Sequence, residues 1–247
     1  MGALPQRTEA VVLRTTNYSE ADRIVTLLTA DQGLRKGFAK AARNSRKRFS
    51  GGLEPFTRAI FHWREGRGTL WSLQDAELLD GHYGLRDDIR RLALAGYGVE
   101  LVELLLEEGE PQPAVYSMVC AFLAYLATGG DPAVARLLLE LRLVNDLGYI
   151  PHLLHCSECF RVFHQESIRF DTARGGCLCL ACAGGSGFEI SLGTAGSLAR
   201  TLKVESDRFA GFQFGELTLH EGQKILSQVL RSILPREPKS LRFLAQL

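Results

Sequence analysis

The sequence predicts an α+β protein in which a small β-barrel precedes a region of helices. Short strand-like runs separated by turn residues occupy the first 80 positions, and apolar residues at helical spacing begin after Tyr83. Two cysteine pairs then interrupt the helical pattern. We therefore expect two domains, residues 1–80 and 81–247, with a cysteine-rich finger at 152–186 inside the second.

The first domain is predicted from five runs of β-branched and apolar residues. Turn signals separate the runs, among them the segments 31–33 and 65–68. The runs cover residues 9–15, 22–29, 34–39, 56–63 and 69–73. Five strands within about 75 residues favour a five-stranded barrel of the OB-fold type, whose usual ligands are oligonucleotides and oligosaccharides. Phe61, Trp63 and Trp71 lie on these strands and are expected to fill the barrel core.

The second domain is predicted to be all-helical apart from the cysteine-rich finger. Pro113 opens one expected helix, and Asp131 followed by Pro132 is typical of an N-cap and a first helical residue. The expected helices cover residues 85–108, 114–128, 132–147, 194–204 and 216–234.

Two features of the sequence bear on its cellular compartment. The longest strongly apolar stretch, residues 119–127, is about half as long as a membrane-spanning helix requires. The first residues do not have the pattern of a secretory signal. We therefore expect a cytoplasmic protein with no membrane partner. The cytoplasm is reducing, and clustered cysteines there more often hold metal than form disulfides.

The formal net charge of +1 hides a segregation of charge along the chain. Residues 1–80 contain 13 Lys and Arg against 9 Asp and Glu, whereas residues 81–247 contain 16 against 19. Seven cations lie within 14 residues, and no acid occurs between Asp31 and Glu54. The seven are Arg35, Lys36, Lys40, Arg43, Arg46, Lys47 and Arg48. Because a phosphate backbone releases counterions when such a cluster binds it, we predict a nucleic-acid site here, in preference to a merely solvated loop.

Aromatic residues flank and follow this basic run. Phe38 precedes most of the cations and Phe49 directly follows them, so both are candidate stacking platforms for bases. The competing interpretation for aromatic residues in this region is burial in the barrel, which we prefer for Phe61, Trp63 and Trp71.

The most specific motif is a pair of C-x-x-C sequences separated by 19 residues, with Cys156 and Cys159 in the first and Cys179 and Cys182 in the second. Each pair directs two thiolates at one ion, and four sulfurs complete a tetrahedron. We predict one structural zinc per chain. Cys177, His155 and His164 are alternative ligands if one of the four is misassigned, whereas Cys120 lies on an apolar helix face and is expected in the core.

An enzymatic alternative also involves these cysteines. His164 and Glu166 followed by the second cysteine pair are similar to the H-x-E…P-C-x-x-C arrangement of zinc nucleobase deaminases. Leu178 replaces the expected proline, however, only 12 residues separate the two halves, and the first cysteine pair would have no role. Since other catalytic motifs are also missing, we expect no catalytic residues and no enzyme. A third interpretation is a zinc-stabilised scaffold for protein partners.

Several short motifs, in order and spacing, resemble the RecO family of bacterial recombination-mediator and DNA-repair proteins. They extend over nearly the whole chain. The motifs are residues 17–25, 37–43, 53–56, 147–149 before the first cysteine pair, Gly175-Gly176 before the second, and 239–244.

The resemblance implies an N-terminal OB-fold, a helical domain carrying a zinc finger, and no catalysis of bond chemistry. It implies binding of single- and double-stranded DNA, annealing of complementary strands, and action with RecR to load RecA on DNA coated by single-stranded-DNA-binding protein, near the nucleoid. The acidic tail of that protein is expected on the helical domain, near Arg136 and Arg142 or near residues 239–242. By the same resemblance the family's basic loop corresponds to Lys40, Arg43, Arg46, Lys47 and Arg48.

Overall fold

The computed structural model describes residues 6–45, 47–66, 68–164 and 167–247. Contacts between Cα atoms divide the chain into two compact units. One unit contains the described residues up to Gly129 together with Pro238–Leu247, and the other contains Gly130–Glu237. The domain boundary expected near residue 80 from the sequence pattern stays a prediction.

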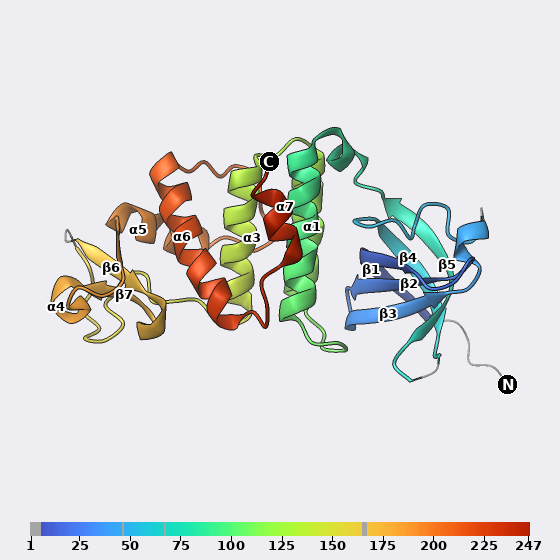
Figure 1. Cartoon of the computed structure of the whole chain (residues 1–247), viewed down its shortest axis with the longest axis horizontal. Helices are drawn as coiled ribbons and strands as arrows, with labels where there is room; N and C mark the ends of the chain where they lie inside the picture. Colours follow the sequence, from blue (N-terminus) through green and yellow to red (C-terminus); the bar gives the residue numbers. More distant parts are fainter. Residues whose placement is uncertain (1–5, 46, 67, 165–166) are drawn as a thin grey trace. The chain divides into compact units, whose positions relative to one another are not determined.

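Five strands form a closed barrel in the first unit (Figure 1). They are β1 (Gln6–Asn17), β2 (Arg23–Thr29), β3 (Gly33–Ala39), β4 (Arg58–Arg64) and β5 (Trp71–Asp80). The order around the barrel is β1-β2-β3-β5-β4, and only the β3–β5 pair is parallel among these strands. The predicted five-stranded barrel is confirmed.

The barrel core is built from alternating apolar residues of all five strands. Phe61, Trp63 and Trp71 are at most 5% exposed, which confirms their predicted place in the core. The rings of Trp63 and Trp71 stack with their centroids 3.7 Å apart. A Cβ atom at Gly37 would come within 2.6 Å of Leu73 Cγ, so glycine permits the close approach of β3 to β5.

The strand β5 is longer than the sequence pattern predicts. The predicted run ends at residue 73, but pairing with β4 continues until Arg58 meets Asp80. Asp75 and Glu77 interrupt the apolar composition there because their side chains point out of the barrel, where the Asp75 carboxylate contacts His62 Nδ1 at 2.6 Å.

Three helices complete the first unit: α1 (Ile89–Leu105), α2 (Pro113–Ala127) and α7 (Lys239–Leu244). The helix expected at 85–108 is interrupted at Asp88, which has extended backbone and accepts hydrogen bonds from the N–H groups of Arg90 and Arg91. Asp88 therefore ends the 3-10 turn η2 (Tyr83–Asp87) and caps α1. Helix α7 lies along α1 (Figure 1), where the Glu100 carboxylate accepts hydrogen bonds from the backbone N–H groups of Lys239 and Ser240.

The second unit combines helices with a small sheet. Helices α3 (Pro132–Asp146) and α6 (Glu216–Ile233) pack together, and α5 (Leu192–Thr201) packs on α6 (Figure 1). Asp131 accepts hydrogen bonds from the N–H groups of Ala133 and Val134, which confirms the predicted N-cap of α3. Across the described part of the chain, no helix has both the length and the apolar character needed to cross a membrane.

The cysteine-rich finger and the residues directly after it form a three-stranded sheet that the sequence pattern does not reveal. The strands of this sheet are β6 (Ile168–Asp171) and β7 (Gly176–Cys179) of the finger and β8 (Phe188–Ile190) after it, in the order β7-β6-β8. The 3-10 turn η3 (Thr172–Arg174) connects β6 to β7, and the short helix α4 (Leu180–Ala183) follows β7. Strands of three or four residues are too short to show a period-two pattern.

Candidate nucleic-acid interface and metal centre

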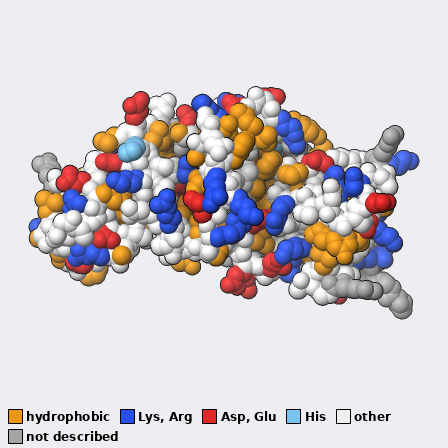
Figure 2. Space-filling view, viewed as in Figure 1, with side chains coloured by type: hydrophobic (Ala, Val, Ile, Leu, Met, Phe, Trp, Pro, Cys, Tyr) orange, Lys and Arg blue, Asp and Glu red, His pale blue; other side chains and the backbone are white. Residues whose placement is uncertain are grey.

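The connection between β3 and β4, residues 40–57, is called here the basic loop. It begins with Lys40 and the 3-10 turn η1 (Ala42–Asn44). Lys40, Arg43, Lys47 and Arg48 are exposed along it. Arg46, the fifth cation of this loop, lies outside the described residues. Figure 2 shows basic side chains on the visible face of the barrel.

Hydrogen bonds hold the basic loop in a defined shape. The Arg48 guanidinium donates to the Lys40 carbonyl oxygen at 2.6 Å, which closes the loop on itself. The Arg43 guanidinium donates to the Glu20 carbonyl oxygen at 2.8 Å and connects the loop to the turn between β1 and β2. The cations of this loop are therefore presented from a folded segment, although their side chains remain in solvent.

Asp22 anchors the start of the basic loop. Its carboxylate accepts a 2.8 Å hydrogen bond from the backbone N–H of Ala41, a residue in the left-handed conformation at φ 53°. The hydrogen bonds from the Ala41 N–H and from the Ser19 hydroxyl, with the nearby charge of Lys40, lower the pKa of Asp22 despite partial desolvation. The anchor is therefore ionised at neutral pH.

Arg35 and Lys36 are on strand β3 and not on the basic loop. Lys36 forms an ion pair with Glu108, a residue beyond the end of α1. The Arg35 guanidinium lies 5.5 Å from the centre of the Trp71 ring and in a cation–π position. The predicted site thus separates into loop cations in solvent and two strand cations with protein partners, and the role of each in binding nucleic acid stays a prediction.

One of the two predicted stacking platforms is buried, and an aromatic residue that was not predicted is exposed. Phe49 is only 3% exposed and belongs to the barrel core, so the prediction that its ring offers a stacking platform is wrong. Phe38 is half-buried, and its ring meets that of Tyr18 edge to face at 5.8 Å. Tyr18 is 68% exposed in the turn between β1 and β2 and was not predicted as a site residue. Its only signal in the sequence is an aromatic residue in a polar turn.

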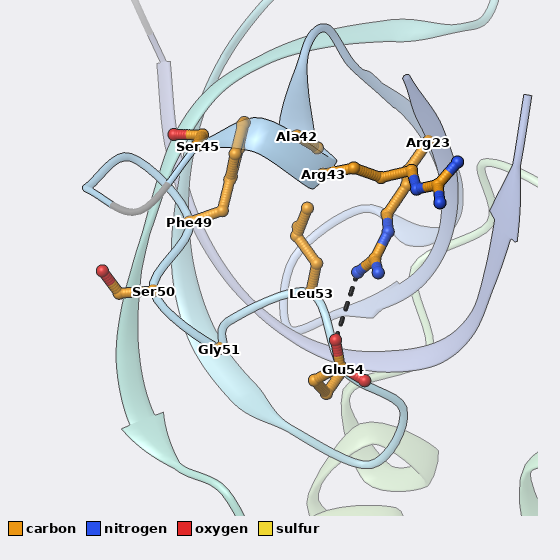
Figure 3. A pocket seen from close by; sticks show the side chains of 9 residues that line it. All are labelled: Arg23, Ala42, Arg43, Ser45, Phe49, Ser50, Gly51, Leu53 and Glu54. Atoms are coloured by element: carbon orange, nitrogen blue, oxygen red, sulfur yellow. Dashed lines mark hydrogen bonds and ion pairs between the residues drawn. The ribbon is translucent and has the colours of Figure 1, made fainter. Parts of the chain in front are cut away.

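A pocket of about 170 Å³ lies between β2 and the basic loop (Figure 3). Arg23 and Arg43 line one side of it, and an ion pair of 3.1 Å joins Arg23 Nη1 to Glu54 Oε1. The remaining lining residues are Ala42, Ser45, Phe49, Ser50, Gly51 and Leu53. Arg23 and Glu54 were not predicted as site residues, because the pocket depends on the folded path of the loop.

The finger brings together the four predicted metal-ligating cysteines. The sulfurs of Cys156, Cys159, Cys179 and Cys182 all lie within 4.8 Å of one another, and those of Cys159 and Cys179 are 3.9 Å apart. A tetrahedral site with zinc–sulfur bonds of about 2.3 Å separates its sulfurs by about 3.8 Å. This group of cysteines can therefore hold one metal ion with the geometry that zinc prefers.

The alternative ligands are not members of this group among the described residues. Cys177 is fully buried next to it, and burial, with the nearby Cys156, raises the pKa of the Cys177 thiol to about 12. His164 is exposed, while the rings of His155 and His152 contact each other. The geometry thus favours the four cysteines of the two C-x-x-C pairs.

Backbone groups prepare the first cysteine for metal binding. Burial disfavours the thiolate of Cys156, but hydrogen bonds from the N–H groups of Cys159, Cys179 and Glu158 outweigh it and lower the pKa to about 6. The thiolate is the form that binds metal. The pKa of Cys182 is raised because neighbouring sulfurs share its proton and like charges cannot all ionise without a cation between them.

Arg174, in the turn η3, connects the two cysteine pairs. Its Nε donates to the Glu158 carboxylate at 2.7 Å, and its other nitrogens donate to the carbonyl oxygens of Cys182 and Ala183 at 2.7 and 3.1 Å. This residue was not predicted. A Cβ at Gly176 would come within 2.5 Å of the His152 carbonyl oxygen, at a φ of 139°, so only glycine fits between the first segment of the finger and β7.

The fold and these two sites define a class: OB-type barrel proteins with a basic loop and a helical region that carries a four-cysteine finger. Two family models match the chain, "Recombination protein O N terminal" over residues 3–82 and "Recombination protein O C terminal" over residues 86–242. The chain belongs to the RecO family of DNA repair proteins. The resemblance drawn from the sequence motifs is confirmed.

Similar proteins named DNA repair protein RecO match over almost their whole length. The protein of Syntrophotalea carbinolica is 48% identical, over 97% of this chain and 93% of its own. Those of Geobacter sulfurreducens and Anaeromyxobacter sp. strain K are 37% and 35% identical, with at least 94% of each chain covered.

Proposed function

We propose that this protein is a non-catalytic recombination mediator that binds single- and double-stranded DNA and anneals complementary strands. With RecR, it promotes loading of RecA in recombinational repair at the nucleoid, in the cytoplasm. The observation that supports this most is the basic loop, whose exposed cations are held on an OB-type barrel by the contact between Asp22 and Ala41. OB-type barrels bind oligonucleotides through such positively charged surfaces.

The mechanism requires electrostatics and base pairing only. Cations of the basic loop neutralise phosphates and hold the backbone without reading its sequence. Exposed Tyr18 offers a ring on which a base can stack beside the loop. Shielding the negative charge of two strands lets their complementary bases meet. Base pairing supplies the free energy of annealing, so no nucleotide hydrolysis is needed.

The four cysteines are proposed to hold one structural zinc per chain. A closed set of four sulfurs leaves no position for water, so the ion would hold the finger together and would not catalyse. Glu166, the general acid and base of the deaminase alternative, lies outside the described residues, and the complete sulfur set disfavours that alternative.

The tail of single-stranded-DNA-binding protein is proposed to dock at residues 239–242. Two docking places are expected from the sequence. Helix α3 is the less suitable one, because its Arg142 is only 1% exposed and the guanidinium lies against Phe209 and Phe212, where a peptide cannot reach its charge. Lys239 and Arg242, by contrast, are exposed on α7. Their charge suits an acidic peptide.

An annealing assay tests the proposal. Complementary oligonucleotides coated by single-stranded-DNA-binding protein are mixed with the chain at several salt concentrations, and duplex formation is followed by fluorescence. Replacing Lys40, Arg43, Lys47 and Arg48 with alanine should abolish most of the acceleration and flatten its salt dependence. A matched control replaces four exposed cations of the second unit, namely Arg200, Lys203, Arg208 and Arg231.

Three outcomes would contradict the proposal. Wild-type protein without effect on annealing, but with measurable RecR binding, would favour the protein-interaction scaffold. Equal loss in the loop variant and the control variant would show that overall charge, and not the basic loop, governs binding. Deamination of cytosine or adenine by the zinc-loaded protein, lost in Glu166→Ala, would favour the enzyme.

A further inference from the structure

The pocket between β2 and the basic loop has the chemistry of an anion site (Figure 3). Arg23 comes from the first residue of β2, and Arg43 from η1, so the two cations belong to separate elements joined by the Asp22 anchor. The hydroxyl-bearing Ser45 and Ser50 also line the pocket. Arginine and serine are side chains that commonly contact phosphate oxygens.

A carboxylate of the protein already lies in this pocket. Glu54 pairs with Arg23 at 3.1 Å, but its side chain remains 52% exposed. Such an exposed pair contributes little to stability. The Arg23 Nε, in contrast, is buried and has no hydrogen-bond partner among the described residues. Glu54 therefore satisfies only part of the hydrogen-bonding capacity of this guanidinium.

The volume is large enough for a phosphate group. A pocket of about 170 Å³ holds the volume of about five or six water molecules at ~30 Å³ each. Ala42, Phe49 and Leu53 lie behind this lining and are each at most 7% exposed, so the surface that a ligand meets is mainly polar. A phosphate in this pocket places its charge beside Arg23 and Arg43.

We propose that the pocket binds one backbone phosphodiester of DNA, and that this phosphate replaces Glu54 on Arg23. The inference rests on the proposed DNA binding and adds to it a specific contact and an internal competitor. Glu54 occupies Arg23 when DNA is absent and lowers the affinity for phosphate, because the ion pair must open before DNA enters.

The test compares affinities of single and double variants for a fluorescein-labelled 15-nucleotide oligo(dT), measured by anisotropy between 50 and 300 mM salt. Arg23→Gln should weaken binding about fivefold and reduce the slope of log K against log salt by about 0.7, the value for one phosphate contact on a single strand. Glu54→Gln should strengthen binding about threefold, because the competitor loses its charge. In the Arg23→Gln background the same Glu54→Gln change should have no effect.

Matched controls remove one negative and one positive charge at positions outside the pocket. Glu77→Gln neutralises an exposed carboxylate on the outside of the barrel, and Arg200→Gln neutralises an exposed cation in the second unit. Both should leave the affinity within the error of wild type. Circular dichroism checks that each variant is folded, and Arg23→Met, which also removes the charge, replaces Arg23→Gln if the latter is not.

A direct readout is the Arg23 Nε–H resonance in NMR spectra, which should shift when oligo(dT) is added but not with inorganic phosphate at equal ionic strength. A shift with inorganic phosphate alone would overturn the assignment to DNA. If Glu54→Gln changed the DNA affinity no more than Glu77→Gln does, or changed it equally with and without Arg23→Gln, the proposed phosphate site in the pocket would be wrong, although the basic loop could still bind DNA. Absence of DNA binding by the wild type would overturn the proposed function and the pocket together.

Discussion

The carboxylate of Asp22 accepts a 2.8 Å hydrogen bond from the backbone N–H of Ala41 and so joins the first hairpin of the barrel to the start of the basic loop. The backbone N–H of Arg43 reinforces this connection with a hydrogen bond to the Ala21 carbonyl oxygen. A loop of cations repels itself, and attachment at its start reduces the conformational freedom that would be lost on binding.

Removal of this anchor should loosen the basic loop. In Asp22→Ala, trypsin should cleave the loop several times faster, and DNA affinity should fall about threefold because more ordering accompanies binding. Asp87→Ala, which removes an exposed carboxylate at the end of η2, serves as the control. Unchanged cleavage in Asp22→Ala would show that the anchor does not order the loop.

The anchor should also depend on pH. The folded pKa of Asp22 is below its ordinary value of 3.8, so the contribution of the anchor to stability is complete above that value and is lost as pH falls through the lower folded pKa. The amide resonance of Ala41 should therefore stay constant from neutral pH down to about pH 4 and move only in more acidic solution. Movement between pH 5 and 7 would contradict the assignment.

The loop cations and the strand cations should differ in their effect on salt dependence. Lys47→Gln removes an exposed charge and should lower the salt slope on single-stranded DNA by about 0.7. Lys36→Gln should lower it less, because Lys36 already pairs with Glu108. Filter binding over a range of salt concentrations measures both slopes, and equal slopes for the two variants would contradict the distinction.

The cysteine assignment predicts which thiols matter for metal binding. Elemental analysis of purified protein should find one zinc per chain, and Cys156→Ser should lose it together with protection of the finger from proteolysis. Cys177→Ser should keep the zinc, because Cys177 lies outside the group of four sulfurs. Loss of zinc in Cys177→Ser with retention in Cys156→Ser would reverse the assignment.

The barrel was predictable because its strands show local patterns, whereas the site residues around it depend on contacts between distant segments. Trp63 and Trp71 are on separate runs that each alternate, and their burial follows from that alternation. Phe49 lies beside a run of cations and looks exposed in the sequence, but the loop turns its ring into the core. Asp22 contacts Ala41 only because a hairpin and a loop meet in the fold.

The metal centre shows the same division. The two C-x-x-C pairs predict the ligands, since each pair is a local motif with a required spacing. Arg174 connects the pairs through carbonyl oxygens and one carboxylate, and an isolated arginine in a turn has no distinguishing signal. The short strands of the finger gain their stability from this closure and not from their own composition.

Tyr18 should contribute to the binding of single strands. Its ring is 68% exposed beside the half-buried Phe38, and stacking of a base on such a ring contributes about 1–3 kcal/mol. Tyr18→Ala should therefore weaken binding of oligo(dT) at least fivefold while leaving the salt slope unchanged, because no phosphate contact is removed. Tyr83→Ala, at an equally exposed tyrosine in η2, is the control, and equal affinities for the two variants would contradict stacking at Tyr18.

The stability of the second unit should depend on the buried carboxylate of Glu140. This side chain is fully buried on α3 and accepts hydrogen bonds from Arg136 Nε at 2.8 Å and from Gln223 Nε2 of α6 at 2.7 Å. Removing one partner of a buried charged pair costs about 3 kcal/mol, since the remaining polar groups lose their acceptor. Glu140→Ala should therefore lower the midpoint of urea unfolding followed by circular dichroism. Glu140→Gln retains one acceptor oxygen and should lower it by less than half as much, and an Ala variant as stable as the wild type would show that this network does not hold α3 to α6.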